Sequence, residues 1–240
     1  KSGVKMEVIR HGKYKSAVEP FLAQEMSPEN REQMTVLLNS VWNTIVADIS
    51  KSRKLSVAQL NAIANTLGAR TPELALANKL VDKVAYEDEY HDMIRAKLKV
   101  DKKEKYDIVS ITDYAKKASS TVEDYSKDDI IAVIYAQGEI AGGEGDVNVI
   151  GEGSIKRSLQ EARDDKDVKA IVLRVNSPGG SALTSELIWR EIEITKKVKP
   201  VGVYMGNYAA SGGYYIAANA DRIFAEPNTI TGSIGVFGML

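Results

Sequence analysis

A serine flanked by small residues is the first candidate for chemistry in this sequence. Ser211 lies in Ala209-Ala210-Ser211-Gly212-Gly213, shortly after the apolar run of residues 201–205. A strand followed by a helix here would place Ser211 at the positive end of the helix, with the Gly212 N–H beside its hydroxyl. That arrangement would pair a nucleophile with an oxyanion donor. The alternative is that Ser211 only caps the helix, which is the commonest role of a serine at such a position.

A second glycine-rich turn, Asn176-Ser177-Pro178-Gly179-Gly180-Ser181, follows the apolar run of residues 170–175. Its two glycines let the backbone approach a ligand closely, because no Cβ stands in the way. The helix predicted after the turn would begin with unpaired N–H groups. The turn is therefore either an anion-binding loop or a simple tight turn with a helix cap.

Activation of Ser211 would require a base. The chain contains two histidines, of which His91 lies in a charged segment typical of a solvated helix face, and His11 lies in a polar turn. A lysine whose pKa is lowered by burial can also accept the proton of a serine. Lys15 stands among aromatic and small residues beside a short apolar segment, and Lys13 is its neighbour. Spacing alone does not choose between Lys15, Lys13 and His11.

Alternating strands and helices in the second half must position both turns. Strands are predicted over residues 130–135, 170–175 and 201–205, and helices over residues 154–163 and 181–197. The near-continuous apolar character of the first strand indicates burial on both faces. Such alternation is typical of parallel strands joined by right-handed crossovers, which predicts an α/β fold. Active sites in these folds lie at the carboxyl ends of strands, where both turns fall.

The first half of the chain is predicted to be mainly helical. Residues 4–9 alternate as a short strand, and the Ser-Pro-Glu and Thr-Pro-Glu triplets that begin at residues 27 and 71 are helix-start signals. A stretch rich in lysine and aspartate then indicates an exposed connection. These changes predict three parts: residues 1–100, a connection over residues 101–127, and residues 128–240.

Composition excludes several classes of function. A net charge of −1 over 240 residues gives no concentrated basic face, so we expect no nucleic-acid partner. The absence of cysteine excludes disulfides, thiolate catalysis and cysteine-ligated zinc. No stretch approaches the roughly 18 apolar residues of a membrane span, so we expect this chain to be soluble. The missing initiator methionine and an apolar strand that stops in mid-pattern indicate part of a longer protein.

Four separated motifs, taken together, resemble the long, two-domain form of the signal peptide peptidase A family. They are GKYKSAVEPF at residues 12–21, NSPGGS at 176–181, ASGGY at 210–214 and TGSIGVFG at 231–238. The resemblance implies a Clp protease/crotonase-like fold of stacked ββα units. It also implies that residues 1–100 are the end of a first protease-like domain, which carries the base, and that residues 128–240 are the core of a second, truncated one, which carries the nucleophile.

The resemblance also implies roles for individual residues. Ser211 matches the nucleophile of the family, Lys15 the general base, and Ser233 a hydroxyl that holds the lysine amine. The N–H groups of Gly179 or Gly180 and of Gly212 match the oxyanion hole. These roles supply each part of a Ser/Lys dyad once, and the chemistry requires no metal and no organic cofactor.

The resemblance further implies an endopeptidase that cuts apolar peptides, such as remnant signal peptides, at the bacterial membrane. The catalytic part would lie outside the cytoplasm, form a homo-oligomer, and be anchored through a segment that this chain does not contain. Two alternatives remain open. One is a crotonase-type enzyme acting on acyl-CoA thioesters, and the other is a non-catalytic peptide-binding or scaffold fragment.

Overall fold

The computed structural model describes residues 7–101, 104–119, 129–235 and 237–240. The chain forms two compact units. The first contains Lys1–Trp42 and Lys127–Leu240, and the second contains Asn43–Ser126. The candidate residues Lys15, Ser211 and Ser233 all belong to the first unit.

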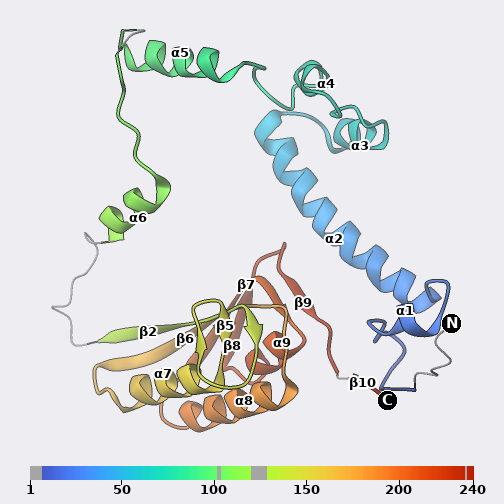
Figure 1. The fold of residues 1–240 in the computed structure, drawn as a ribbon, viewed down its shortest axis with the longest axis vertical. Coiled ribbons are helices and arrows are strands. Elements are labelled where there is room, and N and C mark those ends of the chain that lie inside the picture. Colours follow the sequence, from blue (N-terminus) through green and yellow to red (C-terminus); the bar gives the residue numbers. More distant parts are fainter. Residues whose placement is uncertain (1–6, 102–103, 120–128, 236) are drawn as a thin grey trace. The chain divides into compact units, whose positions relative to one another are not determined.

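A five-stranded parallel sheet forms the centre of the first unit (Figure 1). Four strands follow the order β2-β6-β7-β8, and β9 pairs with the last residues of β7. Helices precede β6, β7 and β8, as the alternation of the sequence predicts, whereas among the described residues no helix separates β8 from β9. The strands are β2 (Ile130–Gln137), β6 (Val168–Ser177), β7 (Val201–Ala210), β8 (Arg222–Ala225) and β9 (Ile230–Gly232), and the helices are α7 (Glu152–Asp164), α8 (Ala182–Lys196) and α9 (Gly212–Ala217).

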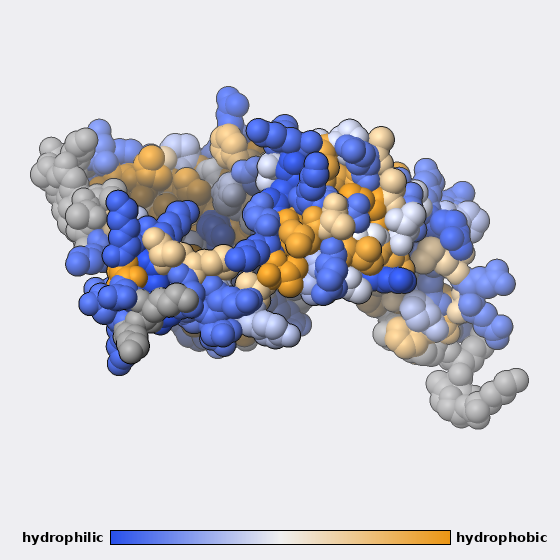
Figure 2. Space-filling view, turned by 90° about the horizontal axis from the view of Figure 1, so that it is seen from above, coloured by the Kyte–Doolittle hydropathy of each residue, from blue (hydrophilic) through white to orange (hydrophobic). Residues whose placement is uncertain are grey.

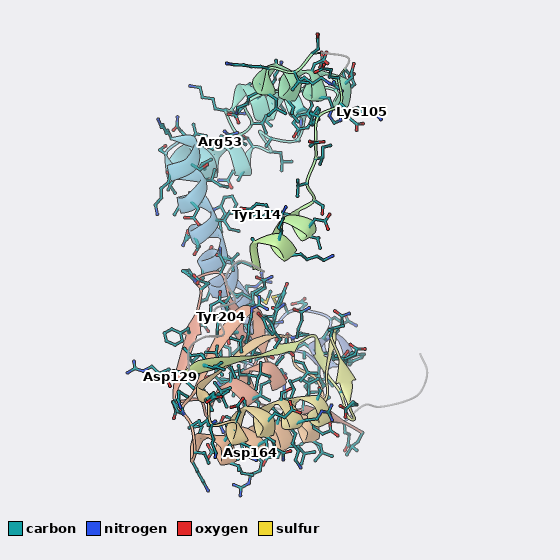
Figure 3. The ribbon with its side chains drawn as sticks, turned by 90° about the vertical axis from the view of Figure 1, so that its left-hand side faces the viewer. Arg53, Lys105, Tyr114, Asp129, Asp164 and Tyr204 are labelled. Carbon is teal, nitrogen blue, oxygen red and sulfur yellow. The ribbon has the colours of Figure 1, made fainter. Side chains whose placement is uncertain are left out.

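The helices α7 and α8 lie on one face of this sheet (Figures 1 and 3). Side chains alternate along each strand, so every second residue points toward the helices. In Figure 3, Asp164 at the end of α7 lies on the helix side and Tyr204 of β7 on the other side. Full burial of one aliphatic side chain stabilises the folded state by about 1.5–3 kcal/mol, so the apolar core holds the helices on the sheet. The core between sheet and helices includes Ile134, Ile155, Leu159, Ile171, Leu173, Val175, Ile188, Ile192, Val201, Val203, Met205 and Ile216.

Two smaller sheets complete the first unit. The strands β3 (Glu139–Ile140), β4 (Gly145–Asp146) and β5 (Val149–Ile150) form a three-stranded sheet. The strand β1 (Val8–Arg10) pairs in antiparallel fashion with β10 (Phe237–Met239), which brings an early segment beside a late one. The short helix α1 (Glu19–Leu22) follows the turn after β1.

The second unit is helical. The helix α2 (Pro28–Arg53) begins in the first unit and ends in the second, and it is followed by α3 (Val57–Asn65), α4 (Pro72–Ala77), α5 (Glu87–Leu98) and α6 (Ile111–Ser119). Side-chain caps set two of these starts: Ser56 accepts the N–H of Gln59, and Thr71 accepts the N–H of Leu74. None of the helices in the described ranges has the length and apolar character needed to cross a membrane.

The predicted α/β class, with a parallel sheet and a mainly helical first half, is confirmed. The first predicted strand is shifted to Val8–Arg10, while its residues 4–6 lie outside the described residues. The predicted connection over residues 101–127 contains α6, and its residues 102–103 and 120–127 are likewise outside the described part.

The prediction that β2 is buried on both faces is wrong. Its side chains alternate between the core and the surface, and Ile131, Val133 and Tyr135 are 63%, 50% and 65% exposed. The physical reason is that β2 is an edge strand of a sheet that carries α7 and α8 on one face. Figure 2 shows hydrophobic residues reaching the surface in several places on the face that it presents.

Candidate active site

Ser211 occupies the N-cap position of α9, but its side chain makes no capping hydrogen bond. The simple capping role considered from the sequence is therefore not realised. Ser181 provides the contrast, because its hydroxyl caps α8 by accepting the N–H of Thr184 at 3.2 Å. The Ser211 backbone has φ +52° and ψ −118°, which is unusual for a residue other than glycine. Such strain costs about 1–3 kcal/mol and is concentrated at functional sites.

The loop with the two glycines lies directly against Ser211. A Cβ placed on Gly179 would lie 2.7 Å from the Ser211 Cβ and 2.8 Å from the Gly212 nitrogen. A Cβ on Gly212 would lie 3.4 Å from the Gly180 nitrogen. Positive φ angles of 105° at Gly179 and 151° at Gly180 shape the loop. The structure therefore brings together the four residues of the predicted nucleophile and oxyanion hole.

Hydrogen bonds distinguish the three candidate oxyanion donors. The Gly179 N–H already donates to the Ser177 hydroxyl at 3.1 Å. In the described part of the chain, the N–H groups of Gly180 and Gly212 have no acceptor. Ile140 fixes the loop from the other side, because its N–H donates to Gly179 O at 2.9 Å and its carbonyl accepts the N–H of Ser181 at 2.8 Å.

Lys15 is buried and points at Ser233. It lies between β1 and α1, is 8% exposed, and donates from Nζ to Ser233 O at 3.1 Å and to Ser233 Oγ at 3.2 Å. The Phe237 ring centroid is 5.9 Å from Nζ. Burial lowers the pKa of the Lys15 amine below the ordinary lysine value. Within the described residues, no carboxylate lies within 4 Å of Lys15 Nζ to oppose this shift.

The three other candidate bases occupy different surroundings. The Lys13 side chain is 79% exposed, and its nearest carboxylate oxygen, on Glu29, is 4.0 Å away. His11 is exposed in the turn after β1. His91 belongs to the second unit, where its ring nitrogen contacts the Tyr106 hydroxyl. Of the four candidate bases, only Lys15 is buried.

Backbone pairing places Ser233 close to Ser211. The end of β7 pairs with β9 through Ala210 and Gly232, and the Ser211 N–H donates to Gly232 O at 2.9 Å. Ser233 is the next residue, so two hydrogen bonds and one peptide link connect Ser211 to the Lys15 amine. The part of the chain that the structure describes contains no hydrogen bond between Lys15 Nζ and Ser211 Oγ. Catalytic hydrogen bonds of this kind are often long before substrate binds.

A buried carboxylate anchors the loop that carries Lys15. Glu19 accepts hydrogen bonds from Ser27 Oγ at 2.5 Å and from Asn30 Nδ2 at 2.8 Å. These bonds hold the pKa of the Glu19 carboxyl below its ordinary value, although burial acts in the opposite direction. A further bond joins Gln33 Nε2 to Ser16 Oγ at 2.7 Å. The loop is thereby fastened to the first two turns of α2.

Ser233→Ala removes one of the two acceptors of the Lys15 amine while leaving the Ser233 carbonyl. We expect kcat to fall roughly 10- to 100-fold, because one hydrogen bond to a charged group contributes about 1.5–3 kcal/mol and each 1.4 kcal/mol or so is tenfold in rate. The melting temperature should change little, since Ser233 is exposed. Steady-state kinetics of the variant with a peptide substrate check this expectation, and an unchanged kcat would remove Ser233 from the site.

Comparison with known proteins shows that this chain belongs to the family described as Peptidase family S49, which matches residues 1–101 and 193–240. It is 38% identical to Protease 4 of Haemophilus influenzae, an alignment that covers 100% of this chain and 40% of that protein. It is 40% identical to Protease 4 of Salmonella typhi over 99% of this chain and 39% of the relative. It is 35% identical to the chloroplastic serine protease SPPA of Arabidopsis thaliana, an alignment that covers 98% of this chain and 35% of that protein.

The chain thus spans about two fifths of the length of these curated relatives. Among solved structures, a mutant of ClpP1 from Listeria monocytogenes is 19% identical and overlaps with 41% of this chain and 50% of its own, with a TM-score of 0.32. A TM-score of 0.32 is too low to establish that the two chains share a fold. The resemblance predicted from the four motifs is confirmed at the level of the family.

Proposed function

We propose that this chain carries the catalytic centre of a serine endopeptidase that uses a Ser/Lys dyad. Ser211 is the nucleophile, Lys15 is the general base, and Ser233 holds the amine of Lys15. One observation carries the proposal. The Ser211 hydroxyl makes no capping hydrogen bond, and it lies beside the N–H groups of Gly180 and Gly212, which have no acceptor in the described part of the chain. A serine needed only for the helix would use its hydroxyl as a cap.

The proposed reaction begins when Ser211 Oγ attacks the carbonyl carbon of the scissile peptide bond. Its proton passes to the neutral Lys15 amine, and the N–H groups of Gly180 and Gly212 bind the oxyanion that forms. The ammonium of Lys15 then protonates the leaving amine, and the bond to that nitrogen breaks. Water attacks the resulting acyl-enzyme with Lys15 again as base, which releases the acid and restores Ser211.

Of the predicted oxyanion donors, we assign the hole to Gly180 and Gly212. The Gly179 N–H is less suited, because it already donates to the Ser177 hydroxyl. Gly179 instead allows the close approach, since a side chain there would collide with Ser211. The hole then consists of two preorganised donors, one from each glycine-rich turn.

Apolar peptides are the substrate class that the surroundings of the site favour. Leu183 in the first turn of α8 and Ile234 beside Ser233 are both 70% exposed. Tyr208, three residues before Ser211, is about half exposed. These residues lie within three positions of Gly180, Ser211 and Ser233 in the sequence, and large exposed apolar side chains can bind an apolar peptide. Remnant signal peptides belong to this class.

The wider setting of the reaction is also part of the proposal. We assign residues 1–100 to the end of one protease-like domain and residues 128–240 to the core of a second. A homo-oligomer anchored in the bacterial cell membrane through a segment outside this chain, with its catalytic part outside the cytoplasm, fits a protease for signal peptides. Lys15 would serve its own chain, because its acceptor Ser233 lies in the same chain.

Cleavage of defined peptides tests this function. Purified full-length protein is incubated with a 20-residue signal-peptide-like substrate and with a charged peptide of equal length, and new termini are identified by mass spectrometry. We expect internal cleavage of the apolar peptide at the higher rate. No cleavage of either peptide, together with saturable binding of coenzyme A, would instead support the crotonase-type alternative.

A further inference from the structure

The pairing of β6 with β7 contains an irregularity just before the catalytic turn. The two strands pair in register as far as Val175 opposite Met205, and the next pair is Ser177 opposite Ala209. Between these pairs β6 has one residue, Asn176, whereas β7 has the three residues 206–208. Extra residues in one strand form a bulge, which bends the strand and redirects the side chains that follow.

Side chains supply the hydrogen bonds that the ladder lacks at this bulge. Asn176 Oδ1 accepts the N–H of Tyr208 at 3.1 Å, and Thr229 Oγ1 donates to Gly206 O at 2.8 Å. The Asn176 carbonyl is engaged on the opposite side, where it accepts the N–H of Gly138 at 3.0 Å. Asn176 therefore holds the segments on both sides of β6: its backbone carbonyl binds Gly138 after β2, and its side chain binds Tyr208 in the bulge of β7.

The fit between Asn176 and the bulge is close. A Cβ on Gly206 would lie 3.1 Å from Asn176 Oδ1 and 3.2 Å from Asn176 Cβ. The asparagine side chain thus occupies the space beside Gly206 and keeps the three residues of β7 arched. With a short apolar side chain at position 176, the Tyr208 N–H would lose its acceptor, and the bulge would lose the group that holds it.

The register beyond the bulge determines where the catalytic groups meet. After it, Ala209 pairs with Thr231 and Ala210 with Gly232, and the Ser211 N–H donates to Gly232 O. A slip of one residue in β7 would turn each side chain to the opposite face. It would also move Ser211 away from Gly179, which is fixed to the end of β6.

We infer that Asn176 is a positioning residue of the catalytic centre. Its side-chain oxygen holds the bulge of β7 and thereby sets Ser211 against the oxyanion loop and against Ser233, the acceptor of the Lys15 amine. This inference rests on the proposed Ser/Lys function. It predicts that Asn176 affects the chemical step more than substrate binding, because misplacement of a nucleophile by about 1 Å can cost about 100-fold in rate.

The experiment compares three variants of the full-length protein with wild type in a peptide cleavage assay. Asn176→Ala removes the acceptor, whereas Asn176→Asp keeps an oxygen in the same position. Asn219→Ala is the matched control, since Asn219 is also half-buried and donates to Trp189 O and Glu193 in the same unit. Each kcat and KM is measured well below the lowest melting temperature of the set.

For Asn176→Ala we expect kcat to fall roughly 10- to 100-fold with KM changed less than about 3-fold. Asn176→Asp should recover at least about 10-fold of that loss, and Asn219→Ala should keep the wild-type kcat. The inference is overturned if Asn176→Ala keeps the wild-type kcat, if Asp is no better than Ala, or if Asn219→Ala loses as much. Inactive wild-type protein would instead contradict the proposed function itself.

Discussion

Replacement of Ser211 by alanine is expected to abolish peptide cleavage without unfolding the protein. Loss of a catalytic nucleophile costs on the order of 10⁴-fold or more in kcat, because no other group can form the acyl-enzyme. The free energy of unfolding should stay almost constant, since the Ser211 hydroxyl makes no capping bond. Single-turnover kinetics of the Ser211→Ala variant measure the loss of cleavage rate, and its thermal melting curve measures the change in stability.

Ser56→Ala is the matched control for this prediction. Ser56 caps α3 in the second unit by accepting the N–H of Gln59, whose side chain bonds back to the Ser56 N–H. Removing such a cap costs about 1 kcal/mol of stability. We therefore expect Ser56→Ala to melt earlier and to cleave normally. Cleavage by Ser211→Ala at a rate near that of wild type would eliminate Ser211 as the nucleophile.

Replacement of Lys15 has the second large expected effect. Lys15→Met keeps a side chain of similar length and removes the base, so kcat should fall on the order of 10³-fold or more. Lys15→Arg should be equally impaired, because a guanidinium stays protonated and cannot accept the serine proton. Lys13→Met is the control, because the Lys13 side chain is exposed, and this variant should cleave at nearly the wild-type rate. A Lys13→Met variant that is inactive beside an active Lys15→Met would reverse the assignment.

The pH dependence of cleavage follows from the same lysine. Only the neutral amine can accept the proton of Ser211, so kcat/KM should rise with pH through the pKa of Lys15 in the free protein. Burial lowers this pKa, and the rise should therefore occur at lower pH than for an exposed lysine. A profile that rises only where free lysine titrates would contradict the role of burial.

The sequence was sufficient to predict the strands and helices on either side of both glycine-rich turns, but not β9, which leads into Ser233. The apolar runs before Asn176 and before Ser211 correspond to β6 and β7, and the helix-start signals at Pro28 and Pro72 correspond to α2 and α4. Local patterns carry this information, because period and turn chemistry act over a few residues. Periodicity could not reveal the exposed face of β2, since burial depends on which elements cover a sheet.

The details of the site depend on contacts that the sequence does not specify. Spacing could not separate Lys15 from Lys13, whereas burial of one and exposure of the other does. Glu19, Asn176 and Ser177 stand in motifs that the sequence singled out, but their roles could be inferred only from their hydrogen bonds. Each depends on a partner that is distant in the chain or on the exact course of a loop.

Labelling by a fluorophosphonate tests the central claim, a Ser211 nucleophile activated by Lys15, most directly. Such a reagent reacts with activated serines, and the modified residue can be identified by peptide mass spectrometry. We predict a single adduct on Ser211, formed faster as the pH rises through the lowered lysine pKa, and labelling at least about 100-fold slower in Lys15→Met. An adduct on another serine, or equal rates in wild type and Lys15→Met, would contradict the claim.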